Sequence, residues 1–130
     1  MPEEILHFVL SGQTYAKKNS QKVIYNKWLK RNIVVHSANY NKWEADCRKQ
    51  MNFKKCYKLG IDYPIILKMH FYVKDKRNRD LSNYLEGPQD LFVDMGLLKD
   101  DNYNIVCGHD GTRMFIDKEN PRIECWLLKE

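Results

Sequence analysis

KDKRNRDLSNYLEGPQDLFVDMGLLKDDN, residues 74–102, is the stretch that most constrains the interpretation of this 130-residue chain. It begins with a basic cluster, continues with Asp80 near an expected helix start, and ends on the pair Asp100-Asp101. Carboxylate oxygens bind Mg²⁺, and Mg²⁺ together with Arg and Lys neutralises phosphate charge. The order of charges therefore indicates a divalent cation held beside a phosphate backbone.

The middle of this stretch predicts a helix over Asn83–Met95. Apolar residues fall on one side at helical spacing, and Glu86, Asp90 and Asp94 fall on the opposite side at i, i+4 and i+8. The pair Gly87-Pro88 should kink the helix or delay its start.

Three interpretations of these acids remain open. Asn83-x-x-Glu86 could be a capping box, the acids could form a solvated face, or some of them could join Asp80 and the Asp100-Asp101 pair as metal ligands. Like charges at i, i+4 repel by a few tenths of a kcal/mol, so a stripe of three needs an offset, which a bound cation would supply. The paired Asp has its own ordinary explanation, because Asp is common in turns.

The rest of the chain predicts strands around this helix. Pro64–Lys74 alternates apolar and polar residues and is expected to be a half-buried strand. We expect further strands over Glu4–Ser11, Tyr103–Ile116 and Pro121–Leu128, the last two antiparallel around a turn at 117–120, a hairpin from Lys22–Tyr25 and Asn32–His36, and a helix from Ser37 or Asn39 to about Lys55. The predicted fold class is α+β, with one domain over residues 1–130 and helices packed on a mixed, mostly antiparallel sheet.

Charge is distributed unevenly along the chain. Residues 5–58 carry twelve bases and two acids, whereas the remainder carries ten bases and fifteen acids. This asymmetry favours a basic part that grips a polyanion and an acidic part that uses carboxylates locally. The alternative is an uneven distribution on a solvated surface.

Other classes of protein fit the sequence less well. The N-terminus lacks the basic and apolar regions of a signal peptide, and no run approaches the roughly 20 apolar residues of a membrane span, so we expect an intracellular protein with no membrane partner. The four cysteines match no zinc-ligand spacing and are expected to be reduced.

The acidic stretch also resembles a known family. Three segments follow one another along the chain: Arg77-Asn78-Arg79-Asp80-Leu81-Ser82-Asn83, a helix containing Asp90, and Lys99-Asp100-Asp101-Asn102. Their order resembles that in the RusA-type Holliday junction resolvases, many of which phages or prophages encode. In that family a strand leads into Arg-Arg-x-Asp-x-Asp-Asn, then a helix with a Lys and a later Asp, then an Asp-Asp pair. The loop Gly12–Ser20 and the segment Tyr40-x-x-Trp43-Glu44 resemble further parts of the family.

Two positions depart from the family pattern. Ser82 stands where the family has its second acid, and Glu86 stands where it has the helix Lys. One carboxylate is lost and one gained, which predicts a rewired metal site in which Glu86 replaces the missing Asp and Lys74, Lys76 or Arg79 supplies the cation. The same departures fit a protein that has lost cleavage and kept junction binding.

The resemblance implies a homodimer that nicks four-way DNA junctions by phosphodiester hydrolysis during recombination and repair, in the cytoplasm of a bacterial or phage-infected cell. Asp80, Glu86 and Asp101 would be catalytic and hold Mg²⁺ or Mn²⁺, with Asp100 or Asp90 as further ligands. The alternative is a catalytically silent, structure-selective DNA-binding protein of the same fold. The expected DNA contacts are Lys17, Lys18, Asn19, Ser20, Lys22, Lys30, Arg31, Lys76, Arg77 and Arg79. Trp28, at a basic turn, would either stack on an opened base or serve as a packing or dimer contact.

Overall fold

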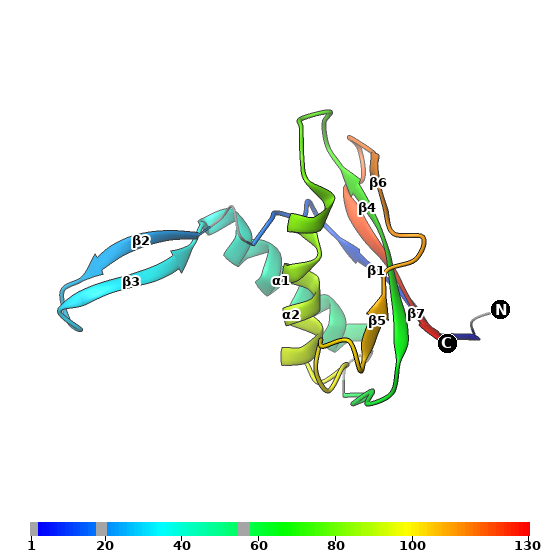
Figure 1. Cartoon of the computed structure of the whole chain (residues 1–130). Helices are drawn as coiled ribbons and strands as arrows, with labels where there is room; N and C mark the ends of the chain where they lie inside the picture. The colour runs from blue at the N-terminus through cyan, green and yellow to red at the C-terminus, as the bar shows by residue number, and fades with distance from the viewer. Residues whose placement is uncertain (1–2, 18–20, 55–57) are drawn as a thin grey trace.

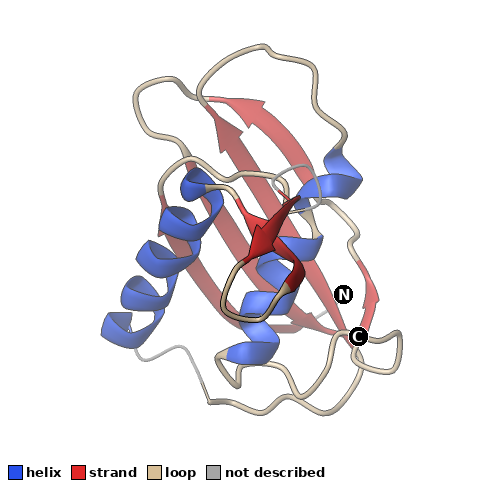
Figure 2. Ribbon diagram, turned by 90° about the vertical axis from the view of Figure 1, so that its left-hand side faces the viewer, coloured by secondary structure: helices blue, strands red, loops and turns tan. Residues whose placement is uncertain are grey.

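A computed structural model describes residues 3–17, 21–54 and 58–130 of the chain, and it has two layers. Two α-helices cover one face of a five-stranded mixed sheet, as Figure 2 shows with the helices in front. The α+β fold class is therefore confirmed. The elements are β1 (Glu3–Ser11), β2 (Gln21–Asn26), β3 (Arg31–His36), α1 (Ala38–Lys54), β4 (Ile65–Val73), the 3₁₀ turn η2 (Leu81–Tyr84), α2 (Glu86–Asp94), β5 (Val106–Gly108), β6 (Arg113–Ile116) and β7 (Arg122–Lys129).

Strand β4 is the centre of the main sheet (Figure 1). It pairs antiparallel with β7 on one edge and parallel with both β5 and β6 on the other, and β7 pairs in turn with β1. The alternation predicted for this strand is confirmed, because the side chains that face the helices are buried and those on the other face are mostly half-buried. The buried set is Ile65, Leu67, Met69, Phe71 and Val73.

The segment after α2 differs from the expectation. The pattern predicts one strand over Tyr103–Ile116 that runs antiparallel to the last strand. The direction is confirmed, because β6 runs parallel and β7 antiparallel to β4, but the single continuous strand is wrong. Two short strands, β5 and β6, are separated by a turn at 109–112, where Gly111 has a positive φ of 84°. Strand β6 pairs with β4 because both edges of β7 are already hydrogen-bonded, to β1 and to β4.

Helix α1 forms as the sequence predicts. Ser37 caps it, with its Oγ accepting a hydrogen bond from the backbone N–H of Tyr40 (3.2 Å). Tyr40, Trp43, Cys47 and Met51, at three- and four-residue spacing, are its buried residues. The helix thereby fixes one apolar stripe on the sheet and leaves the opposite face to solvent.

Helix α2 begins at Glu86, three residues later than the predicted start. Gly87 lies where the two helices come closest, since a Cβ there would stand 3.3 Å from the ring and hydroxyl of Tyr40. Pro88 occupies the first turn, where its missing N–H costs little. The Gly-Pro pair therefore delays the helix and permits its close packing on α1.

Strands β2 and β3 form a separate two-stranded sheet, as the hairpin prediction requires. This hairpin projects from the body of the molecule (Figure 1). We call residues 21–36 the arm. Neither α-helix of the described residues has the length and apolar character needed to cross a bilayer.

Candidate functional site

An open cleft of about 760 Å³ lies at the end of β4, where the chain leaves the sheet. Three cations and one acid line it, together with polar and aromatic side chains from the loop after β1, the start of α1 and η2. This lining is suited to a phosphate group, because several cations converge on a concave surface. The lining residues are Gln13, Tyr15, Asn39, Lys74, Arg77, Asn78, Arg79, Asp80 and Tyr84.

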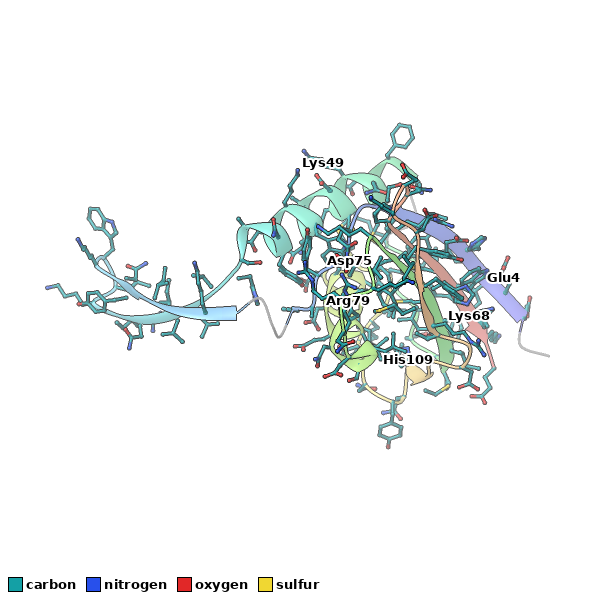
Figure 3. The ribbon with its side chains drawn as sticks, turned by 90° about the horizontal axis from the view of Figure 1, so that it is seen from above. Glu4, Lys49, Lys68, Asp75, Arg79 and His109 are labelled. Atoms are coloured by element: carbon teal, nitrogen blue, oxygen red, sulfur yellow. The ribbon has the colours of Figure 1, made fainter. Side chains whose placement is uncertain are left out.

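The loop that carries these cations is braced by Arg79. Its Nη2 donates to Oδ1 of Asp75 (2.7 Å), and its Nη1 donates to the backbone oxygens of Asp75 (3.0 Å) and Arg77 (3.1 Å). Figure 3 shows Asp75 and Arg79 side by side. A hydrogen bond from the backbone of Arg77, then one from the Arg79 side chain, lowers the pKa of Asp75. With Arg79 only 9 % exposed, Arg77, whose side chain is 77 % exposed, is the better placed to reach a ligand.

Asp90, Glu86 and Glu44 lie near Lys17, Asp94 joins them around Tyr40, and Asp101 lies near Asp90. We call these five carboxylates the acidic cluster. The Nζ of Lys17 lies 2.6 Å from Oδ2 of Asp90. Burial lowers the pKa of Lys17, but the hydrogen bond and charge of Asp90, with the charges of Glu86 and Glu44, outweigh burial and raise it. Lys17 is thus held protonated among acids rather than displayed to solvent.

The acid stripe on α2 has its charges offset by the protein itself. Asp90 pairs with Lys17, and Asp94 pairs with Arg48 (3.3 Å), which also binds Glu44 (3.1 Å). Glu86 is exposed in the first turn of α2, where the positive end of the helix dipole favours a carboxylate.

The capping-box interpretation is wrong. No side chain caps the start of α2, whose N-cap residue is Leu85. Asn83 instead donates a long hydrogen bond to Oδ2 of Asp80 (3.5 Å). Asp80 lies on the wall of the cleft rather than on the helix.

The paired Asp residues play different parts. Asp100 shapes the turn, because its Oδ1 accepts from the backbone N–H of Asp101 (2.7 Å) and its Oδ2 accepts from Nδ2 of Asn102 (3.1 Å). Burial raises the pKa of Asp101, and the charge of Asp90 and the hydrogen bond and charge of Asp100 raise it further. Carboxylates from α2 and from this turn therefore crowd one another.

The predicted site residues lie in several separate parts of the molecule. Glu86 and Asp90 lie near Lys17, Asp101 lies near Asp90 and Asp100, and Asp80 faces the cleft. The predicted DNA contacts Lys76 and Arg77 are exposed on the loop after β4, whereas Arg79 is half-buried there. Those on the arm, Lys22, Lys30 and Arg31, are exposed, and Lys18, Asn19 and Ser20 lie outside the described residues.

Sequence reasoning missed the contributions of α1 to this region. Glu44 and Arg48 bind each other at i, i+4. Burial raises the pKa of Tyr40, and the charges of Glu44, Asp90 and Glu86 raise it further. The i, i+4 spacing of Glu44 and Arg48 was the available signal. No pattern in the sequence links either residue to α2.

The donor chemistry fits a hard divalent cation, since every candidate ligand is a carboxylate and those of Asp90, Asp100 and Asp101 are crowded together. Across residues 3–17, 21–54 and 58–130, no three His, Cys, Asp or Glu side chains stand close enough together to form a ready metal site. Lys17 occupies one oxygen of Asp90. A bound cation would therefore have to draw the carboxylates together.

Replacing Lys17 by Met is expected to destabilise the fold by about 0.5–1 kcal/mol at pH 7, because the acids then repel without their cation. The raised pKa of Lys17 means that the pair is complete below pH 10.5 and is lost as pH rises through the higher folded value. At pH 3, where the carboxylates become protonated, the difference in stability between Lys17→Met and the wild type should be smaller. Urea unfolding at both pH values measures this, with the exposed Lys99→Met as control. An equal loss at both pH values would contradict it.

No family model matches this chain, and no curated protein does either.

Proposed function

We propose that this protein is a metal-dependent, structure-specific endonuclease that cleaves four-way DNA junctions as a homodimer. The single observation that carries the proposal is a cationic cleft whose wall bears Asp80, in a molecule that also gathers Asp90, Glu86 and Glu44 near Lys17. The resemblance to RusA-type resolvases supports the same conclusion. A two-fold symmetric dimer suits a substrate that must be nicked on two strands.

Different residues of the chain would bind DNA and hold the metal ion. Arg77 and Lys74 would bind the phosphate backbone in the cleft, and Arg79 would keep their loop in position. Asp80 from the cleft wall would have to be drawn together with Asp101 and Glu86 to hold Mg²⁺ or Mn²⁺, with Asp100 or Asp90 as a further ligand or an outer partner. The metal would supply a water of lowered pKa and would stabilise the negative charge of the transition state.

Lys17 would supply a cation beside the carboxylates. It is the nearest described partner of Asp90, and its ammonium group is held in its charged form. A phosphate brought to the acidic cluster would meet repulsion from five carboxylates, and Lys17 reduces that repulsion. The resembled family has a Lys where this chain has Glu86. In this chain Lys17, on the N-terminal loop, would supply the positive charge instead.

A second candidate is a catalytically silent protein that binds branched DNA. One observation favours it: the Asp90 carboxylate is already paired with Lys17, and no three described acids are close enough to bind a metal. Such a protein would use the same basic surfaces and would not need a divalent cation.

Cleavage of a labelled four-way junction decides between the two. The protein is incubated with the junction in Mg²⁺, in Mn²⁺ and in EDTA, alongside Asp80→Asn, Glu86→Ala and Glu86→Lys. The matched control is Asp110→Asn, which changes an exposed carboxylate in the turn between β5 and β6. We expect paired symmetric nicks that require metal and that Asp80→Asn reduces by about 10²-fold or more.

The outcomes separate cleanly. Loss of nicking in Glu86→Ala supports a rewired metal site, and full activity in that variant contradicts it. Tight junction binding without nicks in either metal contradicts the nuclease and supports the binding protein.

A further inference from the structure

The arm has one largely uncovered apolar face. Its strands pair only with each other within the described chain, in the register Val23 to Val34 and Ile24 to Ile33. Val23 is 65 % exposed and Val34 is 60 % exposed. An isolated two-stranded hairpin is marginally stable in water, so these side chains indicate a surface that is used when a partner binds.

The apex of the arm is ordered by local hydrogen bonds. Oδ1 of Asn26 accepts from the backbone N–H groups of Trp28 (2.9 Å) and Leu29 (2.9 Å), and Lys30 closes the turn with a positive φ of 51°. This arrangement leaves Trp28 95 % exposed at the tip. A defined turn therefore holds the exposed indole at the tip of the arm, and the arm projects from the body of the molecule (Figure 3).

The base of the arm is fixed to α1. Asn41 donates from Nδ2 to the backbone oxygen of His36 (3.3 Å), and the His36 ring lies 5.0 Å from the Tyr40 ring. Ser37, the next residue, caps the helix. The arm thus extends from a helix whose other contacts reach the acidic cluster through Glu44 and Arg48.

Charge identifies the chemistry of the partner. The arm carries Lys22, Lys27, Lys30 and Arg31, all exposed, and no acid. Two such arms would repel each other, whereas a polyanion would neutralise both. A two-stranded β-ribbon also has the width that the major groove of duplex DNA admits.

We propose that the arm is a nucleic-acid-binding ribbon whose basic side chains hold the phosphates of branched DNA and whose Trp28 stacks on an unpaired or opened base. An apolar or aromatic wedge between bases is a known way of holding distorted DNA, and stacking tolerates any base. The choice of branched DNA rests on the proposed function. The arm would then recognise the branch, while the cleft and acidic cluster act on the backbone.

Binding to a four-way junction in EDTA tests the proposal without cleavage. Trp28 is a usable probe, because the other two of the three tryptophans are sheltered: Trp43 is 4 % exposed and Trp126 is stacked on His7 at 4.6 Å. The fluorescence of Trp28 is obtained as the difference between the emission of the wild type and that of Trp28→Phe. We expect the junction to quench this difference. We expect Trp28→Ala to weaken binding about 5- to 150-fold.

Two controls sharpen the test. Phe53→Ala removes another aromatic side chain that is 88 % exposed, on α1, and should leave the affinity unchanged. Lys27→Gln combined with Arg31→Gln should lower the slope of log affinity against log salt by about 2, because two phosphate contacts are lost.

Two results would overturn the proposal. The first is unchanged affinity and unquenched emission in a protein that still binds the junction. The second is a fall from dimer to monomer mass in Trp28→Ala, measured by sedimentation, which would assign the arm to a second copy of this chain. A protein that binds through the arm but never nicks in Mg²⁺ would refute the nuclease and leave the arm proposal standing.

Discussion

Asp101→Asn is expected to reduce junction cleavage by about 10²- to 10³-fold while leaving the fold at least as stable as the wild type at pH 7. Burial raises the pKa of Asp101, and the charges of Asp90 and Asp100 raise it further. Asparagine keeps the shape of the side chain and removes the negative charge. Activity and stability should therefore change in opposite directions.

The pH dependence follows from the sign of the shift. Since the pKa of Asp101 is higher in the folded state than its ordinary value of 3.8, the folded protein binds this proton more tightly than the unfolded chain does. The contribution of Asp101 to stability therefore falls as pH rises from 3.8 through its higher folded pKa. Above that pKa the ionised carboxylate destabilises the folded state. Asp101→Asn should remove this part of the pH dependence.

Thermal unfolding from pH 3 to pH 7 and the junction assay in Mg²⁺ measure the two effects. Asp110→Asn is again the matched control and should change neither. Undiminished cleavage in Asp101→Asn would remove this residue from the site. A large loss of stability at pH 7 would show that its carboxylate makes a favourable contact instead.

Phe92→Ala is expected to destabilise the fold by about 3–5 kcal/mol. The side chain is 0 % exposed, and its ring meets that of Phe8 on β1 edge-on, with centroids 5.5 Å apart. Truncation leaves a cavity between α2 and the sheet as well as losing buried apolar area. A domain of this size has a total stability of only about 5–15 kcal/mol, so the variant would be close to unfolding at 37 °C.

Urea unfolding measures this loss as a lower midpoint at an unchanged slope. Phe53→Ala, the same change at a position that is 88 % exposed, should shift stability by no more than about 0.5 kcal/mol. A loss below about 1 kcal/mol in Phe92→Ala would mean that the core closes around the gap.

Local patterns predicted the parts of the fold that local chemistry controls. The alternation in β4 and the spacing of Tyr40, Trp43, Cys47 and Met51 in α1 each fixed an element and its buried face. The pairing of β6 was not predictable in this way, because it depends on which edges of β4 and β7 are already occupied. A strand pattern specifies a face but no partner.

The candidate site likewise has a part that the sequence predicts and a part that it does not. Glu86, Asp90, Asp100 and Asp101 lie within sixteen residues of one another, so their grouping could be expected from the sequence. The cation among them comes from 73 positions before Asp90. Only the packing of the N-terminal loop against α2 brings Lys17 there, and no spacing rule in the sequence encodes it.

The place of β7 has a consequence for how the protein is made. Because β7 lies between β1 and β4, the first strand has no partner in the sheet until residues 122–129 have left the ribosome. At ordinary rates of synthesis that delay is roughly 6–24 s. During it, the edges of β1 and β4 that later pair with β7 keep unpaired backbone groups, which other chains can bind. The yield of correctly folded protein should therefore depend on the speed of translation and on chaperones that shield nascent strands.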